Sequence, residues 1–281
     1  MYKYNQEVGK KVKLKSKVLI IAGSDSSGGA GIQADIKTVT ALGSYAMTAI
    51  TAVTAQNTKG VKKIISIPTE IVQKQITMIL DDIGTHAVKI GMLHNTDIIK
   101  SVYKTLKKYK SKNVVLDPVM IAKGGAKLIS NSSIKHLKKL LLPLCTIVTP
   151  NIPEAEVLTG YSISSKEDMI KAAKTILNMG SKNVLLKSGQ LKNKMIFDIL
   201  ATKKGIKIFK KRKIRTKNTH GTGCTLSSAL ATCLSQRKNI VKSCKISLRY
   251  VDKAIISAPG YGKGFGPLNH LVSFNLKNIN V

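Results

Sequence analysis

The chain has 281 residues, of which 43% are hydrophobic, so it can bury one large core or two small ones. A formal net charge of +33 first suggests binding to nucleic acid, but the lysines are scattered and no aromatic residues alternate with them as a base-stacking surface requires. The longest apolar runs, such as residues 18–22, are far too short to cross a membrane.

The four cysteines form neither a C-x-x-C pair nor a zinc-ligand pattern with histidine, which favours reduced thiols in a cytoplasmic protein. Residues 1–17 are basic, mostly polar and without the apolar stretch of a secretory signal. We therefore interpret residues 1–17 as an N-terminal extension with no assigned role and residues 18–281 as one domain.

Short apolar runs alternate with helix-forming stretches along most of the chain. Strands are predicted at residues 18–22, 47–54, 61–67, 87–90, 114–116, 146–149 and 183–189. Helices are predicted at 32–42, at 70–82 behind a Thr69 cap, after Asn95 to 109, from Ser132 or Ser133 to 142, and at 165–179. Residues 122–126 are expected to form a flexible basic loop.

A hairpin predicted at residues 195–201 and 206–214 interrupts the alternation. One further helix is predicted after Gly223 and another at residues 240–257. Alternation of strands and helices is typical of an α/β fold with three α/β/α layers. We predict a mostly parallel central sheet with helices on both faces.

Ligands of open α/β sheets bind at the carboxyl ends of the strands, which draws attention to Gln56 and Asp117. Gln56 follows the strand at 47–54 and can offer an amide to a heteroaromatic ring, although it can also be an ordinary loop residue facing solvent. Asp117 ends the strand at 114–116, where a carboxylate can bind a metal or set the charge of a phosphate site.

Asn151 and Glu154 are three residues apart at a helix start marked by Pro153. Their oxygen atoms can hold Mg²⁺ through water, because Mg²⁺ prefers oxygen ligands and keeps part of its hydration shell. The same spacing is that of a capping box, in which the two residues only stabilise the helix end.

The stretch at residues 218–226 predicts a glycine turn that leads into a helix N-terminus. Unpaired N–H groups and the positive end of the helix dipole make such a turn a site for a phosphate or an oxyanion. Gly221 and Gly223 allow close approach of a ligand, and the pKa of the Cys224 thiol is expected to fall in this field. The alternative is an ordinary helix start with a buried cysteine.

Six motifs in order make the chain similar to the hydroxymethylpyrimidine/phosphomethylpyrimidine kinases of thiamine biosynthesis, in the ribokinase superfamily. They lie at residues 22–35 (AGSDSSGGAGIQAD), 54–58 (TAQNT), 89–93 (KIGML), 116–120 (LDPVM), 149–155 (TPNIPEA) and 218–225 (NTHGTGCT). The resemblance runs from about residue 17 to residue 270.

The resemblance implies a role for each matching residue. The pyrimidine pocket would be lined by Gln56, Gly23, Asp35, Thr54 and Met92. ATP and its phosphates would contact Lys187, Asp117 and Thr222, and Asn151 and Glu154 would hold Mg²⁺ through water. The catalytic group would be Cys224 with Gly221 and Gly223, where most ribokinase relatives carry an aspartate in place of the cysteine.

The implied activity is ATP- and Mg²⁺-dependent phosphorylation of 4-amino-5-hydroxymethyl-2-methylpyrimidine and then of its monophosphate, by a homodimer. A pyridoxine or pyridoxal kinase of the same superfamily is one alternative, a basic nucleic-acid-binding protein is another, and a catalytically inactive relative is a third. The chain departs from the family pattern at Ser188, where relatives often have glycine, and at Gln190, where they often have histidine.

Overall fold

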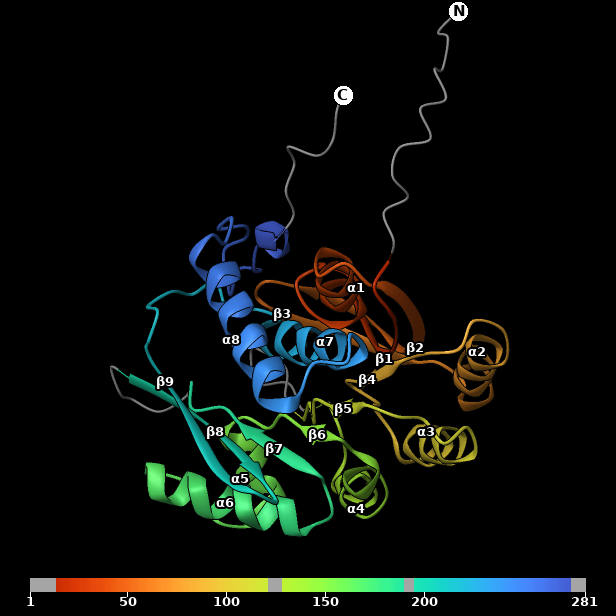
Figure 1. The fold of residues 1–281 in the computed structure, drawn as a ribbon. Helices are drawn as coiled ribbons and strands as arrows, with labels where there is room; N and C mark the ends of the chain where they lie inside the picture. Colours follow the sequence, from red (N-terminus) through yellow and green to blue (C-terminus); the bar gives the residue numbers. More distant parts are fainter. Residues whose placement is uncertain (1–13, 121–127, 190–194, 274–281) are drawn as a thin grey trace, which may run out of the picture.

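The computed structural model describes residues 14–120, 128–189 and 195–273 of the chain (Figure 1). Residues 1–13 of the extension, the loop predicted at 122–126 and Gln190 lie outside the described residues. The part of the extension that is described joins the domain, because Ser16 is buried and its hydroxyl lies 2.7 Å from the Ser44 hydroxyl and 2.6 Å from that of Ser235.

Within the described residues, nine strands form one sheet in the order β3-β2-β1-β4-β5-β6-β7-β8-β9. The strands are β1 Lys17–Asp25, β2 Tyr45–Asn57, β3 Gly60–Ser66, β4 Ala87–Ile90, β5 Val114–Leu116, β6 Ile147–Val148, β7 Asn183–Leu186, β8 Met195–Thr202 and β9 Gly205–Arg212. Pairs from β2 through β7 are parallel, whereas β3, β8 and β9 pair antiparallel at the two edges. The mostly parallel sheet and the hairpin are thus confirmed.

Helices cover both faces of this sheet (Figure 1). One face carries α1 Gly31–Ala41, α7 Thr222–Ser235 and α8 Ile240–Ile256, and the other carries α2 Thr69–Asp82, α3 Thr96–Lys108, α4 Asn131–His136, α5 Ile152–Thr159 and α6 Lys166–Asn178. Two buried aliphatic clusters lie between the sheet and these helix layers. The predicted three-layer α/β/α architecture is therefore confirmed.

Two helix starts differ from the prediction and one agrees with it. Thr69 is the first residue of α2 and does not cap it, since Pro68 takes the cap position without a side-chain hydrogen bond. Helix α4 begins behind Ser130, whose hydroxyl accepts the Ser133 N–H, so the predicted start at Ser132 or Ser133 was slightly late. Asn95 caps α3 as expected, by accepting the Ile98 N–H.

The order of connections places a ligand site at the centre of the sheet. The chain passes from β1 outward to β2 and β3, and then returns to add β4 on the other side of β1. Ligands of open α/β sheets bind where the connections reverse in this way, at the carboxyl ends of the strands. Described residues that follow four of these strands lie at this point: Met92 after β4, Asp117 after β5, Asn151 after β6 and Lys187 after β7.

Candidate active site

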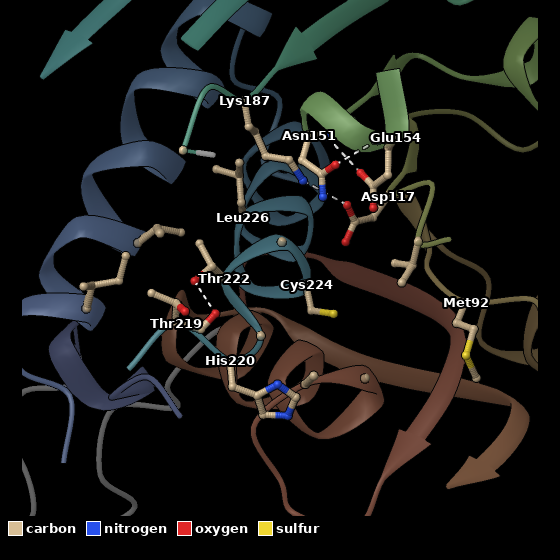
Figure 2. A pocket seen from close by; sticks show the side chains of 18 of the residues that line it. Met92, Asp117, Asn151, Glu154, Lys187, Thr219, His220, Thr222, Cys224 and Leu226 are labelled. Atoms are coloured by element: carbon tan, nitrogen blue, oxygen red, sulfur yellow. Dashed lines mark hydrogen bonds and ion pairs between the residues drawn. The ribbon is translucent and has the colours of Figure 1, made fainter. Parts of the chain in front are cut away.

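A cavity of about 490 Å³ opens at these strand ends. It brings together every residue that the sequence analysis proposed for the site, except Asp35: Gly23, Thr54, Gln56, Met92, Asp117, Asn151, Glu154, Lys187, Gly221, Thr222, Gly223 and Cys224. Figure 2 shows Cys224 between a charged group around Lys187 and the ring of His220. Residues far apart in the chain therefore share one site.

The first turn of α7 faces the cavity. Gly221 takes the N-cap position with a left-handed backbone (φ of 80°), and no side chain of the described residues caps the helix there. A Cβ at Gly221 would overlap the carbonyl oxygen of Gly29, so this position requires glycine. The uncapped N–H groups and the helix dipole give the turn the ability to bind an anion.

A pair of opposite charges lies beside this helix end. Lys187 Nζ is 3.3 Å from Asp117 Oδ1, and a Cβ at Gly223 would lie 3.2 Å from Asp117 Oδ2 and 3.4 Å from Lys187 Nζ. Burial alone would lower the pKa of Lys187, but the carboxylates of Asp117 and Glu154 raise it, so the ammonium stays charged. The cation and the helix N-terminus together form one positive wall of the cavity.

Asn151 and Glu154 form a complete capping box at the start of α5. The Asn151 N–H donates to Glu154 Oε2 at 2.8 Å, and the Glu154 N–H donates to Asn151 Oδ1 at 2.9 Å. Burial raises the pKa of Glu154 to about 7, with a further rise from Asp117 and an opposing effect of Lys187. The capping box is thus formed, and it uses only Oε2 of Glu154, so Oε1 takes no part in it.

The expected fall in the thiol pKa of Cys224 is wrong for this structure. Burial raises that pKa to about 12, and the carboxylates of Asp35 and Asp117 add to the rise. Lys89 and a hydrogen bond from the Gly31 backbone act in the opposite direction but do not overcome it. The prediction rested on the helix field alone, whereas the two carboxylates come from distant segments of the chain.

Asp35 is the one predicted site residue that is not among the residues lining the cavity, so its place in the pyrimidine pocket stays a prediction. It is fully buried, and its carboxylate accepts hydrogen bonds from Lys89 Nζ and Ser228 Oγ, both at 2.7 Å. Lys89 lines the cavity. Lys89 belongs to the KIGML motif but had no predicted role; a lysine in the middle of an apolar strand was the available signal.

Asp25 and His220 form a second pair that the sequence analysis missed. His220 Nε2 lies 2.7 Å from Asp25 Oδ2, and since a carboxylate only accepts hydrogen bonds, Nε2 must carry the proton. Gln56 Nε2 lies 3.4 Å from His220 Nε2. Both nitrogens carry hydrogen, so they do not form a hydrogen bond with each other. The Thr54 hydroxyl lies 2.9 Å from the Ser24 carbonyl oxygen and 3.2 Å from Gln56 Oε1, so its one proton is shared between these acceptors. The N–H groups of the Gln56 amide remain available to a ligand.

The Asp25 carboxylate gives a testable prediction about stability. Burial raises the pKa of Asp25, but hydrogen bonds from His220 and Ser27 lower it by more, so that the resulting pKa is about 2. A depressed folded-state pKa stabilises the protein above the unfolded value and loses this effect as the pH falls toward 2. Asp25→Asn should cost about 2 kcal/mol of unfolding free energy at pH 6 and roughly half of that at pH 3.

Urea unfolding of the wild type and Asp25→Asn at both pH values measures this difference. Asp82→Asn is the control, because Asp82 is an exposed aspartate at the end of α2. A difference between wild type and Asp25→Asn that is the same at pH 6 and pH 3 would contradict the stabilising role of the ionised pair.

An apolar end of the cavity was also missed. It is formed mainly by α7 and α8 and includes Leu226, Leu248, Val251 and Ile255. The sequence pattern of these side chains is that of an ordinary helix core, because an amphipathic pattern is the same for a helix face in the core and for one that lines a pocket.

The phosphomethylpyrimidine kinase family model matches residues 25–269, most of the chain. The chain belongs to the phosphomethylpyrimidine kinase family. It is 44% identical over 265 residues to the hydroxymethylpyrimidine/phosphomethylpyrimidine kinase of Bacillus subtilis, covering 94% of this chain and 97% of that protein. It is 47% identical over 259 residues to the thiamine biosynthesis bifunctional protein ThiED of Geobacter sulfurreducens, covering 92% of this chain and 53% of that longer protein.

Solved structures agree with a ribokinase-like kinase fold. Phosphomethylpyrimidine kinase from Clostridium difficile superposes with a TM-score of 0.77 at 44% identity, covering 85% of this chain and 99% of that one. An ADP complex of Bacillus subtilis pyridoxal kinase superposes with a TM-score of 0.84 at 36% identity, covering 91% and 97%. No helix of the described residues combines the length and the apolar character that crossing a bilayer requires.

Proposed function

We propose that the chain uses ATP to phosphorylate the hydroxymethyl group of 4-amino-5-hydroxymethyl-2-methylpyrimidine, and then phosphorylates the monophosphate to the diphosphate, in thiamine biosynthesis. The observation that carries the proposal is one cavity that holds Gln56, Lys187 and the first turn of α7 with Cys224. Similarity to kinases with this name, at 44% identity over nearly their whole length, supports the same substrate.

The pyrimidine would lie between β1, β2 and β4. Gln56 would donate its free amide hydrogens to a ring nitrogen, with the Thr54 hydroxyl at its carbonyl oxygen. Met92 would contact the ring face, and Gly23 leaves space for it because a Cβ there would meet the Met92 side chain. This binding would direct the hydroxymethyl group toward Cys224.

Phosphoryl transfer depends mainly on alignment and on neutralising charge. Lys187 would bind the ATP phosphates, and the N–H groups of Gly221 and Gly223 would stabilise the charge on the moving phosphoryl group. The apolar end near Leu226 would take the adenine ring. ATP binding is supported by solved complexes of related pyridoxal kinases with ADP and AMP-PCP.

Asn151 and Glu154 are proposed to hold Mg²⁺ through water, and the residues present fit such an ion. Glu154 keeps one carboxylate oxygen outside the capping box, and the described residues contain no cluster of three or more acidic, histidine or cysteine side chains able to hold a metal alone. Mg²⁺ commonly takes its remaining ligands from water and substrate phosphates. When bound, it would neutralise phosphate charge.

Cys224 would accept the proton of the hydroxymethyl group in the first step, as the new O–P bond forms and ADP leaves. The second step attacks with a phosphate oxygen that is already anionic, so it needs little base. Only the thiolate form of Cys224 can accept this proton, and burial raises the thiol pKa to about 12. Positive charge near the sulfur would therefore have to stabilise the thiolate during the first step.

The direct test measures ADP formation by the purified chain with ATP, Mg²⁺ and each of three substrates: the hydroxymethylpyrimidine, its monophosphate and pyridoxal. We expect turnover of the first two and at most slow turnover of pyridoxal. A pyridoxal kinase is the second candidate, because solved pyridoxal kinases share the fold with TM-scores of 0.84 and 0.86. Preference for pyridoxal would overturn the proposal in favour of that alternative.

Gln56→Leu should raise the KM for the hydroxymethylpyrimidine by roughly 10- to 100-fold with a smaller change in kcat, because a buried ring nitrogen loses its donor. Steady-state kinetics at saturating ATP measure the effect. Asn57→Ala is the control, since Asn57 is an exposed amide one residue away that does not line the cavity. Equal effects of the two variants would argue against ring recognition by Gln56.

A homodimer is proposed from the family resemblance. It is supported by an exposed apolar pair on the antiparallel edge: Val53 of β2 lies directly opposite Ile65 of β3, and they are 45% and 58% exposed. Light scattering after gel filtration should give the mass of two chains for the wild type and of one for Val53→Asp/Ile65→Lys. A monomeric wild type would contradict the proposal.

We also propose a cytoplasmic location. The cysteines Cys145, Cys224, Cys233 and Cys244 are all free thiols, as a reducing compartment allows. Fractionation of cells that produce the chain, followed by immunoblotting, tests this.

A further inference from the structure

Lys89 is a buried charge that the proposed mechanism does not yet use. It lies in β4, is fully buried, and its Nζ is 2.7 Å from Asp35 Oδ2 in α1. The other Asp35 oxygen accepts the Ser228 hydroxyl of α7 at 2.7 Å. A Cβ at Gly91 would lie 2.8 Å from Lys89 Nζ, so the glycine of the KIGML motif leaves room for the ammonium.

Stability gives little reason to keep this charge. Replacing a buried ion pair by apolar residues is often neutral or stabilising, because desolvation offsets the attraction between the charges. Lys89 nevertheless lines the catalytic cavity and remains charged: burial lowers its pKa, but Asp35, Cys224 and Asp117 raise it well above its usual value. A retained buried cation at a reaction site points to a function.

The position of Lys89 relates it to Cys224. Both residues line the cavity, and Ser228, which anchors Asp35, lies one turn beyond Cys224 on the same side of α7. The charged groups that act on the thiol come from four elements or their ends: Lys89 in β4, Asp35 in α1, Asp117 after β5 and Lys187 after β7. Among them Lys89 is the main group that favours a thiolate, and both carboxylates oppose it.

We propose that the Lys89 ammonium, held in place by Asp35 and Ser228, is the counter-ion that lowers the free-energy cost of negative charge on Cys224. Lys89 is thus a positioning residue that acts through Cys224. The inference rests on the proposed role of Cys224 as proton acceptor in the first phosphorylation. There the hydroxyl proton moves to sulfur, the O–P bond forms, and the bond between the transferred phosphorus and ADP breaks.

The test uses two substitutions with opposite expected signs. Alkylation of the folded protein by iodoacetamide at pH 9 follows the thiolate fraction of Cys224, with Cys224→Ser giving the background from the other cysteines. Lys89→Met should slow Cys224 alkylation by roughly tenfold or more, and Asp35→Asn should speed it by a similar factor, since one pKa unit changes the thiolate fraction about tenfold. Lys89→Arg should retain much of the wild-type rate.

A purely structural pair would not give this pattern. Loss of packing would change alkylation in the same direction in both variants, and that outcome, or no change in either, would overturn the inference. If Lys89→Met does not fold by circular dichroism, Lys89→Met/Asp35→Asn is compared with Asp35→Asn alone, and the double variant must react more slowly. Kinase activity of the wild type is measured separately, so failure of the proposed function is distinguished from failure of this inference.

Discussion

Cys224→Ala is expected to lower kcat/KM for the hydroxymethylpyrimidine by roughly 10²- to 10⁴-fold, the usual contribution of a positioned proton acceptor. With the monophosphate as substrate the loss should stay below about tenfold, because the attacking phosphate oxygen is already anionic. The ratio of the two losses is the informative quantity, since both steps are proposed to use the same first turn of α7. Separate steady-state assays with each substrate measure it.

Cys233→Ala is the matched control for this experiment. Cys233 is a free, buried cysteine on the same helix α7, and it does not line the cavity. Its replacement should leave both steps close to wild type. Equal losses of both steps in Cys224→Ala would mean that Cys224 shapes the pocket and does not take the proton.

Gly221→Ala is expected to lower both phosphorylations by at least about 100-fold and to destabilise the fold by about 2–5 kcal/mol. An alanine there must adopt a left-handed backbone, and its Cβ would overlap the Gly29 carbonyl oxygen and approach Ala30 Cα at 3.2 Å. Neither neighbour is a flexible side-chain end that could move away. The loop must shift, and the N–H groups of α7 move with it.

Gly160→Ala separates backbone strain from overlap. Gly160 ends α5 in the same left-handed region (φ of 86°), but a Cβ there would meet nothing within 4 Å. Its cost should be only about 1 kcal/mol, with activity retained. Thermal unfolding and both kinase assays on the two variants provide the comparison. If Gly221→Ala and Gly160→Ala lose the same unfolding free energy, the overlap of the new Cβ with the Gly29 carbonyl oxygen adds nothing to the loss of stability, which contradicts the prediction.

Local patterns predicted most of the fold, because a buried parallel strand is a short apolar run and a helix shows its caps and its period. The predicted pyrimidine, phosphate and helix-turn residues, such as Gln56, Lys187 and Gly223, lie in one cavity because strand ends are also where the chain places its glycine loops. The errors in secondary structure concern helix starts: Pro68, and not Thr69, takes the N-cap position of α2, without a side-chain hydrogen bond.

What the sequence could not supply was the set of partners of each buried charge. Asp35 matched a pocket motif, yet it pairs with Lys89, and Asp25 pairs with a histidine 195 residues away. These contacts depend on how α1, α7 and β4 pack together, and no local spacing encodes them.

The sequence by itself determined a glycine turn, a helix N-terminus and a thiol at residues 221–224. Tertiary structure alone decided the electrostatics of that thiol. The helix field is local and favours a thiolate, whereas burial and the carboxylates of Asp35 and Asp117 come from distant segments and raise its pKa to about 12. Desolvation and charge pairing depend on distances in three dimensions, which is why the relation of Lys89 to Cys224 became visible only in the folded chain.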